Sequence, residues 1–410
     1  MAVCTGEKGV GGALMRVLHF LPVWAPAWQF GGPVRSVGRL CEALAFEGVD
    51  VEVITTTAGL PDWPLESTGR PIRQGGVTVT YYPVDSPVGP IRSRALLKAL
   101  PAHLSRTELL HLSAIWQPLG PPVQRAALGQ RVPVIHSLRG ALSSYSLGWK
   151  AWKKLPYHWL VEHPLLRRAA VLHGTSLSEL SDLDNPLLGL QGEPPKRWLL
   201  PNPLDEACFV VNPAAAKALR DRLQVKSEER LLLVCGRHHH KKGLDLLVPV
   251  LSSLASYPWR LLLVGPDEDG SGSFLERQLS RIVGSERLLR LPLQPGSELP
   301  ALFCAADLLL MPSRHENFGN VAVEALACGC PVLLSEAVGA AADIKDVMNS
   351  QPWGTALPRR VELWREWLED WFQVAPMRPE AQPLRGYAGA AAVARSCRAA
   401  YAQVLQQGTP

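Results

Sequence analysis

The sequence has few features of a metalloprotein or of a disulfide-stabilised protein. Its eight cysteines form no CxxC pair and no spacing typical of a zinc site. Most of them lie within apolar stretches, so we expect buried thiols in a reducing cytoplasm. The cysteines are Cys4, Cys41, Cys208, Cys235, Cys304, Cys328, Cys330 and Cys397.

The sequence also lacks a long apolar run and a leader-like start. No stretch of about 18 uncharged apolar residues occurs, so no transmembrane helix is expected. Residues 1–14 have no basic segment followed by an apolar core, which argues against a signal peptide and favours a flexible, Gly-rich tail. We therefore expect a cytoplasmic protein, with peripheral contact at the inner face of the cell membrane as an option.

An excess of charge of one sign is missing as well. The net charge of +5 comes from 42 basic and 37 acidic residues, and this small, scattered excess does not indicate nucleic acid as a partner. Hydrophobic residues make up 47% of the chain and charged residues 19%, which supports sizeable buried cores. A chain of 410 residues is expected to form two or three domains.

The chain does contain two series of short apolar strands that alternate with helices. In the first series, a strand at 17–21 is followed by a glycine loop, a helix pattern that ends at Gly48, and a strand at 51–54. This βαβ order indicates a parallel sheet. Further strands are expected at 77–82, 109–112, 132–135 and 170–173, with loops at 57–74 and 183–197.

The second series starts after the Pro201-Asn202-Pro203 turn. Its strands are continuous apolar runs, as expected when helices cover both faces of a sheet. The fold predicted is therefore α/β, with two Rossmann-like domains joined near 205–212 and a final helix at about 387–405. The strands are expected at 231–235, 261–264, 288–291, 308–311 and 332–334, and the helices at 244–254, 274–283, 299–305 and 320–328.

Two glutamates flank a Phe-Gly turn between two of these strands. Glu316 lies on the loop that leaves strand 308–311, and Glu324 lies in the helix that begins near Asn320. Helix N-termini offer free N–H groups to phosphate, and ligands of open α/β sheets bind at the carboxyl ends of the strands. A loop carboxylate beside such an anion site would hold the hydroxyls of a sugar attached to the phosphate. The alternative is that Glu324 is a solvated helix residue.

A basic turn follows the first strand of the second series. Arg237 and Lys242 lie between Gly236 and Gly243, where Arg237 would fork onto two phosphate oxygens and Lys242 would act as a point charge. The alternative is a solvated surface turn. Three histidines occupy 238–240, but adjacent imidazoles rarely converge on one ion and no nearby cysteine or carboxylate cluster completes a site. We therefore expect a solvated histidine tract and no metal site.

Together these motifs resemble the retaining, family-4 glycosyltransferases of the GT-B fold. The donor-site signature is similar in order and spacing, and Pro201-Asn202-Pro203 resembles the interdomain turn of that family. In the N-terminal half, several segments resemble the subgroup that acts on bacterial surface polysaccharides. The segments that carry the resemblance are 30–33, 137–140, 152–154, 173–176, 236–245, 264–267, 316–324 and 325–332.

The resemblance implies a metal-independent hexosyltransferase that uses a nucleotide-sugar, has no cofactor, and retains the anomeric configuration. It implies that Arg237 and Lys242 neutralise the donor diphosphate, that Glu316 contacts donor-sugar hydroxyls, and that Glu324 holds the ribose. Backbone groups would line the rest of the donor site. These backbone groups belong to Gly31, Gly32, Gly236, Phe318, Gly319, Asn320 and Val321.

The resemblance also implies a division of the chain into parts. Residues 15–205 would form the acceptor-side domain and 206–385 the nucleotide-sugar domain, the two sheets facing across a cleft that closes on substrate. Residues 386–410 would form a helix that returns to the N-terminal domain, and 1–14 the tail. The acceptor would be a glycan or a lipid-linked glycan.

The sequence departs from the family pattern at two places. Many members have a histidine near position 139, used near the donor sugar, whereas this chain has Arg139 with His136 three residues earlier. Both are candidate catalytic residues, and the sequence leaves open which of them faces the cleft. The family's Gly-Gly-x-x-Glu turn is poorly kept at 338–343.

A basic, Trp-rich stretch runs from Trp149 to Arg168. Tryptophan and lysine together suit the interface of a membrane that contains anionic lipid. The alternative is a packed amphipathic helix with a solvated face.

Two other functions remain as alternatives. One is a non-catalytic subunit that binds a sugar nucleotide within a glycan-assembly complex. The other is a dinucleotide-dependent oxidoreductase, which is disfavoured because no G-x-G-x-x-G follows the first strand of either half.

Overall fold

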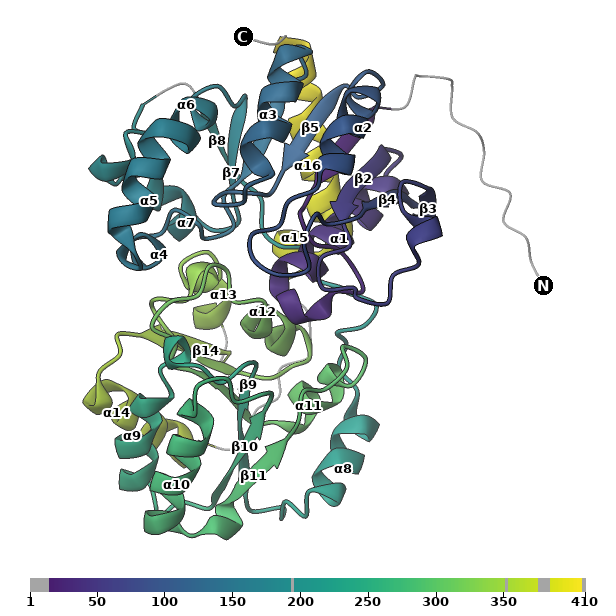
Figure 1. Cartoon of the computed structure of the whole chain (residues 1–410). Coiled ribbons are helices and arrows are strands. Elements are labelled where there is room, and N and C mark those ends of the chain that lie inside the picture. Colours follow the sequence, from purple (N-terminus) through teal and green to yellow (C-terminus); the bar gives the residue numbers. More distant parts are fainter. Residues whose placement is uncertain (1–14, 193–194, 351–352, 375–383, 408–410) are drawn as a thin grey trace, which may run out of the picture.

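Two largely parallel sheets form the frame of the molecule, one in each half of the chain (Figure 1). The computed structural model describes residues 15–192, 195–350, 353–374 and 384–407. The tail predicted at 1–14 and the last three residues of the segment 386–410 lie outside this range. The predicted α/β architecture is confirmed.

The first sheet has eight strands in the order β3-β4-β2-β1-β5-β6-β7-β8, and its neighbouring strands are parallel except for β3 and β4. Its strands are β1 (Arg16–Phe20), β2 (Asp50–Thr56), β3 (Pro71–Gln74), β4 (Val77–Tyr82), β5 (Leu109–Leu112), β6 (Val134–Ser137), β7 (Val171–Gly174) and β8 (Lys196–Leu199). The helices of this half are α1 (Gly32–Phe46), α2 (Arg94–Leu104), α3 (Gly120–Gly129), α4 (Ser144–Gly148), α5 (Ala151–Tyr157), α6 (His163–Leu166) and α7 (Leu177–Ser181).

The second sheet has six strands in the order β11-β10-β9-β12-β13-β14, all of them parallel to their neighbours. Its strands are β9 (Arg230–Cys235), β10 (Trp259–Val264), β11 (Leu288–Leu291), β12 (Leu308–Met311), β13 (Val332–Ser335) and β14 (Gly354–Leu357). Its helices are α8 (Pro213–Arg222), α9 (Leu247–Ser253), α10 (Ser271–Val283), α11 (Leu299–Ala305), α12 (Asn320–Ala327), α13 (Lys345–Ser350) and α14 (Val361–Gln373).

Edge strands are where the sequence-based prediction was wrong. The predicted loop 57–74 contains β3, the predicted loop 183–197 contains the start of β8, and β14 was not predicted. All three lie at sheet edges, where one side of the strand has no neighbour. Because an edge strand need not be apolar on both faces, β3 (PIRQ) and β8 (KRWL) lack the continuous apolar run that marks a central strand.

The last helix of the chain packs on the first sheet. The short helix α15 (Arg385–Ala388) leads into α16 (Ala390–Gln407), which lies beside α1 and shares one apolar core with it (Figure 1, yellow). The hydroxyl of Tyr401 lies 2.6 Å from His111 Nδ1 and 3.2 Å from His19 Nε2. The C-terminal segment is therefore tied into the first sheet by apolar packing and by buried hydrogen bonds.

Two segments of chain cross between the halves side by side. The backbone N–H of Leu204 donates to the carbonyl of Ala388 at 2.7 Å, and Leu204 forms an isolated bridge with Gly389. Two neighbouring, hydrogen-bonded segments of the chain therefore connect the two halves.

The burial of the cysteines and the hydrophobicity of the helices were also predicted from the sequence. Cys208 and Cys235 are partly exposed, so the prediction that the cysteines are buried is wrong for these two. Among the described residues, no helix has both the length and the apolar content needed to cross a bilayer.

Candidate functional site

An ion pair joins the two central loops of the second sheet. Lys242 Nζ lies 2.6 Å from Glu316 Oε1, and both side chains are about four-fifths buried (23% and 18% exposed). The strands β9 and β12 are adjacent and parallel, so the loops after their carboxyl ends emerge at the same edge. The loop after β9 carries Lys242, and the loop after β12 carries Glu316.

The basic turn is held against the second loop by its backbone. Gly243 has φ +63°, and a Cβ there would lie 2.2 Å from the carbonyl oxygen of Pro312, so only glycine fits without a shift of backbone. The N–H of Arg314 donates to the carbonyl of Lys241 at 2.8 Å. These contacts fix the 3₁₀ turn His240–Lys242 and, with it, the direction of the Lys242 side chain.

The charges of this pair support each other. Burial alone would raise the pKa of the Glu316 carboxyl, but Lys242, followed by Lys241 and the Ser313 hydroxyl, brings the pKa below its usual value. Glu316 is therefore an anion at neutral pH and accepts hydrogen bonds only. A carboxylate of this kind can accept hydrogen bonds from the hydroxyl groups of a ligand. Lys242 can then stay beside Glu316 or pair with an anionic group of the same ligand.

The N-terminus of α12 offers unsatisfied donors beside Glu316. Among the described residues, the backbone N–H groups of Phe318, Gly319, Asn320 and Val321 have no hydrogen-bond acceptor. Gly319 precedes the helix with φ +94°, and a Cβ there would lie 2.5 Å from Val338 Cγ1. Free amides at the positive end of a helix dipole form a site suited to an anion.

The turn after β13 supports this loop from the other side. The N–H of Gly339 donates to the carbonyl of Glu316 and that of Ala340 to the carbonyl of Phe318, at 2.9 and 2.8 Å. A Cβ on Gly339 would lie 1.8 Å from the carbonyl oxygen of Asn317. Although 338–343 keeps the family turn poorly, it therefore packs tightly on the predicted sugar-binding loop.

Glu324 is not a solvated helix residue. Its side chain is 10% exposed and lies 3.5 Å from Arg39 Nη1, on helix α1 of the first half. Burial raises the pKa of Glu324 to about 7, with Arg39 and Arg35 acting in the opposite direction. Arg39 was missed by the sequence analysis because nothing in the pattern of α1 indicates a partner in α12.

The predicted glycine loop lies close to the start of α12. A Cβ on Gly32 would lie 3.3 Å from Asn320 Nδ2, whereas a Cβ on Gly31, where φ is +84°, would meet nothing within 4 Å. The structure thus brings Gly32 and Asn320 together across the junction of the halves and leaves open space beside Gly31.

Arg139 and His136 have different environments. Arg139 is partly buried, has φ +52°, and donates from Nη1 to Asn202 Oδ1 at 2.6 Å. Asn202 in turn donates to Asn320 Oδ1 at 3.0 Å, so the interdomain turn links Arg139 to the start of α12. His136 is 1% exposed, and neither ring nitrogen has a hydrogen-bond partner among the described residues. Burial lowers the pKa of His136 to about 3.

Arg237 pairs with Glu268 and not with Glu316 in this structure. Its Nη1 lies 3.0 Å from Glu268 Oε1, and its side chain is 57% exposed. Gly236 and Gly265 pack backbone to backbone, since a Cβ on Gly265 would lie 2.1 Å from the carbonyl oxygen of Gly236. Contact between Arg237 and a ligand near Lys242 would require this long side chain to leave Glu268.

Side chains from both halves meet around the site. Tyr145 stacks on His315 at 5.1 Å between ring centroids, and its hydroxyl lies 3.1 Å from His240 Nε2. Ser143 Oγ lies 3.1 Å from His315 Nε2. Neither Tyr145 nor His315 could be predicted from the sequence, because their contacts depend on how the two halves pack.

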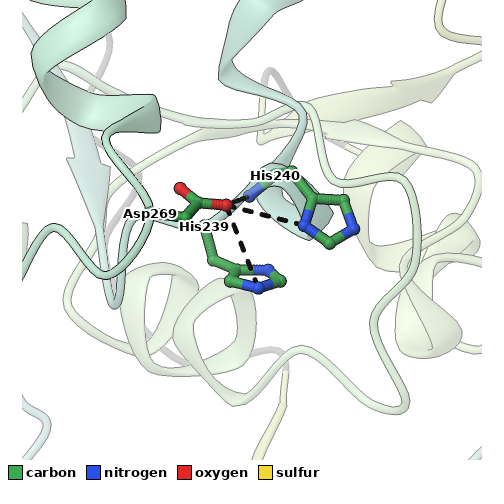
Figure 2. Close-up of side chains that lie close together, drawn as sticks. All are labelled: His239, His240 and Asp269. Carbon is green, nitrogen blue, oxygen red and sulfur yellow. Dashed lines mark hydrogen bonds and ion pairs between the residues drawn. The ribbon is translucent and has the colours of Figure 1, made fainter.

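The histidine tract is not simply solvated. Asp269, on the loop after β10, brings a carboxylate oxygen to 3.9 Å from His239 Nε2 and 3.5 Å from His240 Nδ1 (Figure 2). The expectation of a solvated histidine tract is therefore wrong, since His238 is buried and a single carboxylate lies beside His239 and His240. The strands β9 and β10 are adjacent, so the loops after them meet although 29 positions separate His240 from Asp269.

Family models match both halves of the chain. Residues 31–203 match the model described as "Glycosyl transferase 4-like domain", and residues 216–347 match "Glycosyl transferases group 1". A D-inositol 3-phosphate glycosyltransferase of Kineococcus radiotolerans is 30% identical over 347 residues, which cover 80% of this chain and 78% of that protein.

Solved structures resemble the whole molecule. Sucrose-phosphate synthase from Thermosynechococcus elongatus has a TM-score of 0.71 at 19% identity and covers 96% of this chain and 100% of its own. HepE from Anabaena, in complex with UDP and glucose, has a TM-score of 0.70 at 18% identity and covers 95% of this chain and 100% of its own. At these identities the likeness concerns the fold, and it confirms the GT-B arrangement predicted from the sequence.

Proposed function

Because the chain belongs to the glycosyltransferases that combine a 4-like domain with a group 1 domain, we propose that it transfers a hexose from a nucleotide-sugar to a glycan or lipid-linked acceptor. The observation that carries the donor side is the Lys242–Glu316 pair beside the free amides of α12. A cation, a helix N-terminus and a sugar-binding carboxylate would match the diphosphate and the sugar of one ligand.

The proposed mechanism is electrostatic. As the bond between sugar and diphosphate breaks, negative charge develops on the leaving diphosphate, and Lys242, Arg237 and the free amides would stabilise it. Glu316 would orient the sugar hydroxyls, and Glu324, released from Arg39 or shared with it, would accept hydrogen bonds from the ribose. The proposal assigns no metal ion to this step and includes retention of the anomeric configuration.

The proposal assigns separate tasks to the parts of the chain. Residues 15–205 would bind the acceptor and 206–385 would bind the donor. Residues 386–410 would form the helix that returns to the first domain. The contacts of Arg139 with Asn202 and of Asn202 with Asn320 support a role for Arg139 in setting the position of α12 relative to the first domain. His136 stays a candidate for a role at the donor sugar, because its two nitrogens have no partner among the described residues.

The acceptor and the pathway are further parts of the proposal. The Kineococcus relative is named for D-inositol 3-phosphate, whereas segments of the N-terminal half resemble glycosyltransferases of bacterial surface polysaccharides. We favour a surface glycan at the cytoplasmic face of the membrane, because a Trp-rich and basic surface lies on the proposed acceptor domain.

A screen of sugar nucleotides tests the donor side. UDP-, GDP-, ADP- and TDP-sugars are added in turn, and the cognate one is expected to raise the melting temperature by several degrees at about 100 times its Kd. The same ligand should give a much smaller shift with Glu324→Gln, since the amide keeps only one of the two acceptor oxygens and loses the charge. If no sugar nucleotide changes the melting temperature, the proposed donor site is wrong.

Release of free nucleotide then separates the enzyme from the alternative. A retaining glycosyltransferase is expected to hydrolyse its donor slowly without acceptor, whereas a non-catalytic sugar-nucleotide-binding subunit would show the thermal shift and no release.

The proposed membrane surface lies on helices α4 and α5 and the turn that follows them. Trp149, Trp152 and Leu160 are 67%, 74% and 78% exposed, which is unusual for large apolar side chains. Lys153 Nζ lies 4.7 Å from the ring centroid of Trp152. Exposed indole rings next to ammonium groups suit the headgroup region of an anionic membrane. The stretch Trp149–Arg168 is not exposed throughout, because His158 and Glu162 are buried.

We expect Lys150→Glu with Lys153→Glu to lower binding to vesicles that contain anionic lipid by about tenfold or more, because each basic residue near such a surface contributes about 1 kcal/mol. Lys154 is left unchanged, since its Nζ donates to the carbonyl of Ser146 at 2.6 Å and is structural. The measurement is co-sedimentation at low and high salt.

The matched control reverses the same number of charges on α2, with Arg94→Glu and Lys98→Glu, both exposed and in the same half of the chain. It should sediment with vesicles as the unmodified protein does. Equal loss of binding in both variants would mean that only the net charge of the protein matters. Unchanged sedimentation of Lys150→Glu with Lys153→Glu would refute the membrane surface.

A further inference from the structure

Three potential metal ligands converge at the edge of the proposed donor turn. The side-chain nitrogens of His239 and His240 and a carboxylate oxygen of Asp269 all lie within 4.8 Å of one another. In Figure 2, dashed lines join one and the same carboxylate oxygen of Asp269 to both imidazole rings. Within the part of the chain that the structure describes, no second group of this kind occurs.

The spacing suits a small d-block cation. In a tetrahedral site with bonds of about 2.0–2.1 Å, two ligand atoms lie about 3.3–3.4 Å apart. The observed separations from the Asp269 oxygen are 3.5 Å to His240 Nδ1 and 3.9 Å to His239 Nε2, so these two need shifts of only a few tenths of an ångström. The ligand nitrogens of the two histidines lie within 4.8 Å of each other, so a side-chain rotation that brings the imidazoles closer would complete the site. Two imidazoles and one carboxylate favour Zn²⁺ or its neighbours over Mg²⁺ and Ca²⁺, which prefer oxygen ligands.

The hydrogen bonds around the three side chains decide which nitrogens are available. His240 Nε2 lies 3.1 Å from Tyr145 Oη and can donate its proton there, which leaves the Nδ1 lone pair for a metal. A metal-bound histidine usually donates its other N–H to such a partner. His239 Nδ1 accepts a hydrogen bond from the N–H of Lys241 at 3.2 Å, and this weak contact must be given up when Nε2 binds a metal.

The carboxylate is already oriented by the chain. The N–H of His240 donates to Asp269 Oδ2 at 2.6 Å, and the N–H of Ser271 donates to Oδ1 at 3.0 Å. Asp269 is 28% exposed and the two histidines 38% and 57%, so a cation can enter from solvent and keep water at its remaining positions. The nearby Arg237, Lys241 and Arg314 oppose a dication, which sets an upper limit on its affinity.

We propose that His239, His240 and Asp269 bind one transition-metal dication of the Zn²⁺ class. Its two histidines lie between Arg237 and Lys242 on the chain, but the site uses neither of those cations. It replaces the expectation of a chain without a metal site, and it is separate from the proposed diphosphate chemistry. A cation here would join the turn after β9 to the turn after β10. Its ligand His240 also contacts Tyr145, which belongs to the first half of the molecule. The site is therefore expected to stabilise the folded chain when it is filled.

Binding is tested with the full chain, freed of any polyhistidine tag. Co²⁺ is titrated first, because its visible absorption reports nitrogen ligation, and Zn²⁺ is then added in competition. We expect one bound ion per chain and an affinity at least about tenfold lower for His240→Ala and for Asp269→Asn. Zn²⁺ should raise the melting temperature of the unmodified protein and leave that of His239→Ala with His240→Ala unchanged.

Glu268→Gln is the matched control, because it makes the same carboxylate-to-amide change one position earlier, at a side chain that pairs with Arg237 instead. His163→Gln controls for the loss of a partly exposed imidazole elsewhere. Both are expected to bind Co²⁺ as the unmodified protein does. The site is refuted if the unmodified protein binds no ion, or if His240→Ala and Asp269→Asn bind as tightly as it does.

Discussion

Lys242→Ala is expected to lower turnover of the nucleotide-sugar by about 100- to 1,000-fold, the loss typical of removing one group that stabilises developing negative charge. In the structure Lys242 Nζ faces Glu316 at 2.6 Å, beside the free amides at the start of α12. No other lysine or arginine makes a salt bridge to Glu316 among the described residues. The measurement is nucleotide release under saturating donor, with and without acceptor.

The fold must be tested separately from the chemistry, because Lys242→Ala also leaves the mostly buried Glu316 carboxylate without its cation. An unpaired buried charge costs about 1–3 kcal/mol or more, so the melting temperature should fall. Lys242→Ala with Glu316→Gln removes both charges and should recover stability without recovering turnover.

Lys241→Ala is the matched control for Lys242→Ala, since Lys241 lies in the same turn but faces the ring of Tyr145 at 5.5 Å. It should keep turnover within about tenfold of the unmodified protein. Lys242→Arg should recover part of the loss, because a guanidinium keeps the charge but not the compact geometry. Equal losses in Lys241→Ala and Lys242→Ala would mean that the turn responds only to its total charge, and our assignment of Lys242 would be wrong.

Acid is expected to destabilise the first half of the molecule steeply below pH 6.5. Burial lowers the pKa of His19, His136 and His173 to about 3, helped by Arg139 at His19 and His173. Their ordinary value is 6.5, so between pH 6.5 and 3 the unfolded chain binds more protons than the folded chain. Stability is therefore complete above pH 6.5 and falls as pH drops toward 3, by roughly 1 kcal/mol per pH unit for each histidine.

The structure explains why protons are excluded. His173 Nε2 donates to the carbonyl of Leu200 at 2.9 Å, and its Nδ1 lies 2.6 Å from the hydroxyl of Ser137. His111, whose pKa burial also lowers, lies between Ser137 and Tyr401 of α16. A second proton on His111 or His173 would break one of these buried hydrogen bonds, so acid should loosen α16 together with the first sheet.

Urea unfolding at pH 7, 6 and 5 measures the effect. His136→Leu removes one of the buried rings at a position flanked in the sheet by Leu112 and Leu172, and it should reduce the pH slope by about one proton. His163→Gln, at a partly exposed residue outside the sheet, should leave the slope unchanged. A slope that is the same in all three proteins would show that these rings do not set the acid sensitivity.

The donor-site residues could be found in the sequence because they lie close to strand ends. Lys242 follows β9 and Glu316 follows β12, and apolar runs of five and four residues mark these strands. Once the strands are placed in a parallel sheet, their loops must emerge at one edge. Gly319 could be found in the same way, since a glycine before a helix start is a local signal.

The sequence alone determined the α/β class, the two series of strands, and the basic and acidic turns at their carboxyl ends, because alternating apolar runs and turn residues record local structure. Only the tertiary structure decided which charges meet. Arg39 pairs with Glu324, Asn202 joins Arg139 to Asn320, and Asp269 lies beside two neighbouring histidines. Each of these contacts joins residues from separate elements, and no periodicity along the chain encodes how separate elements pack.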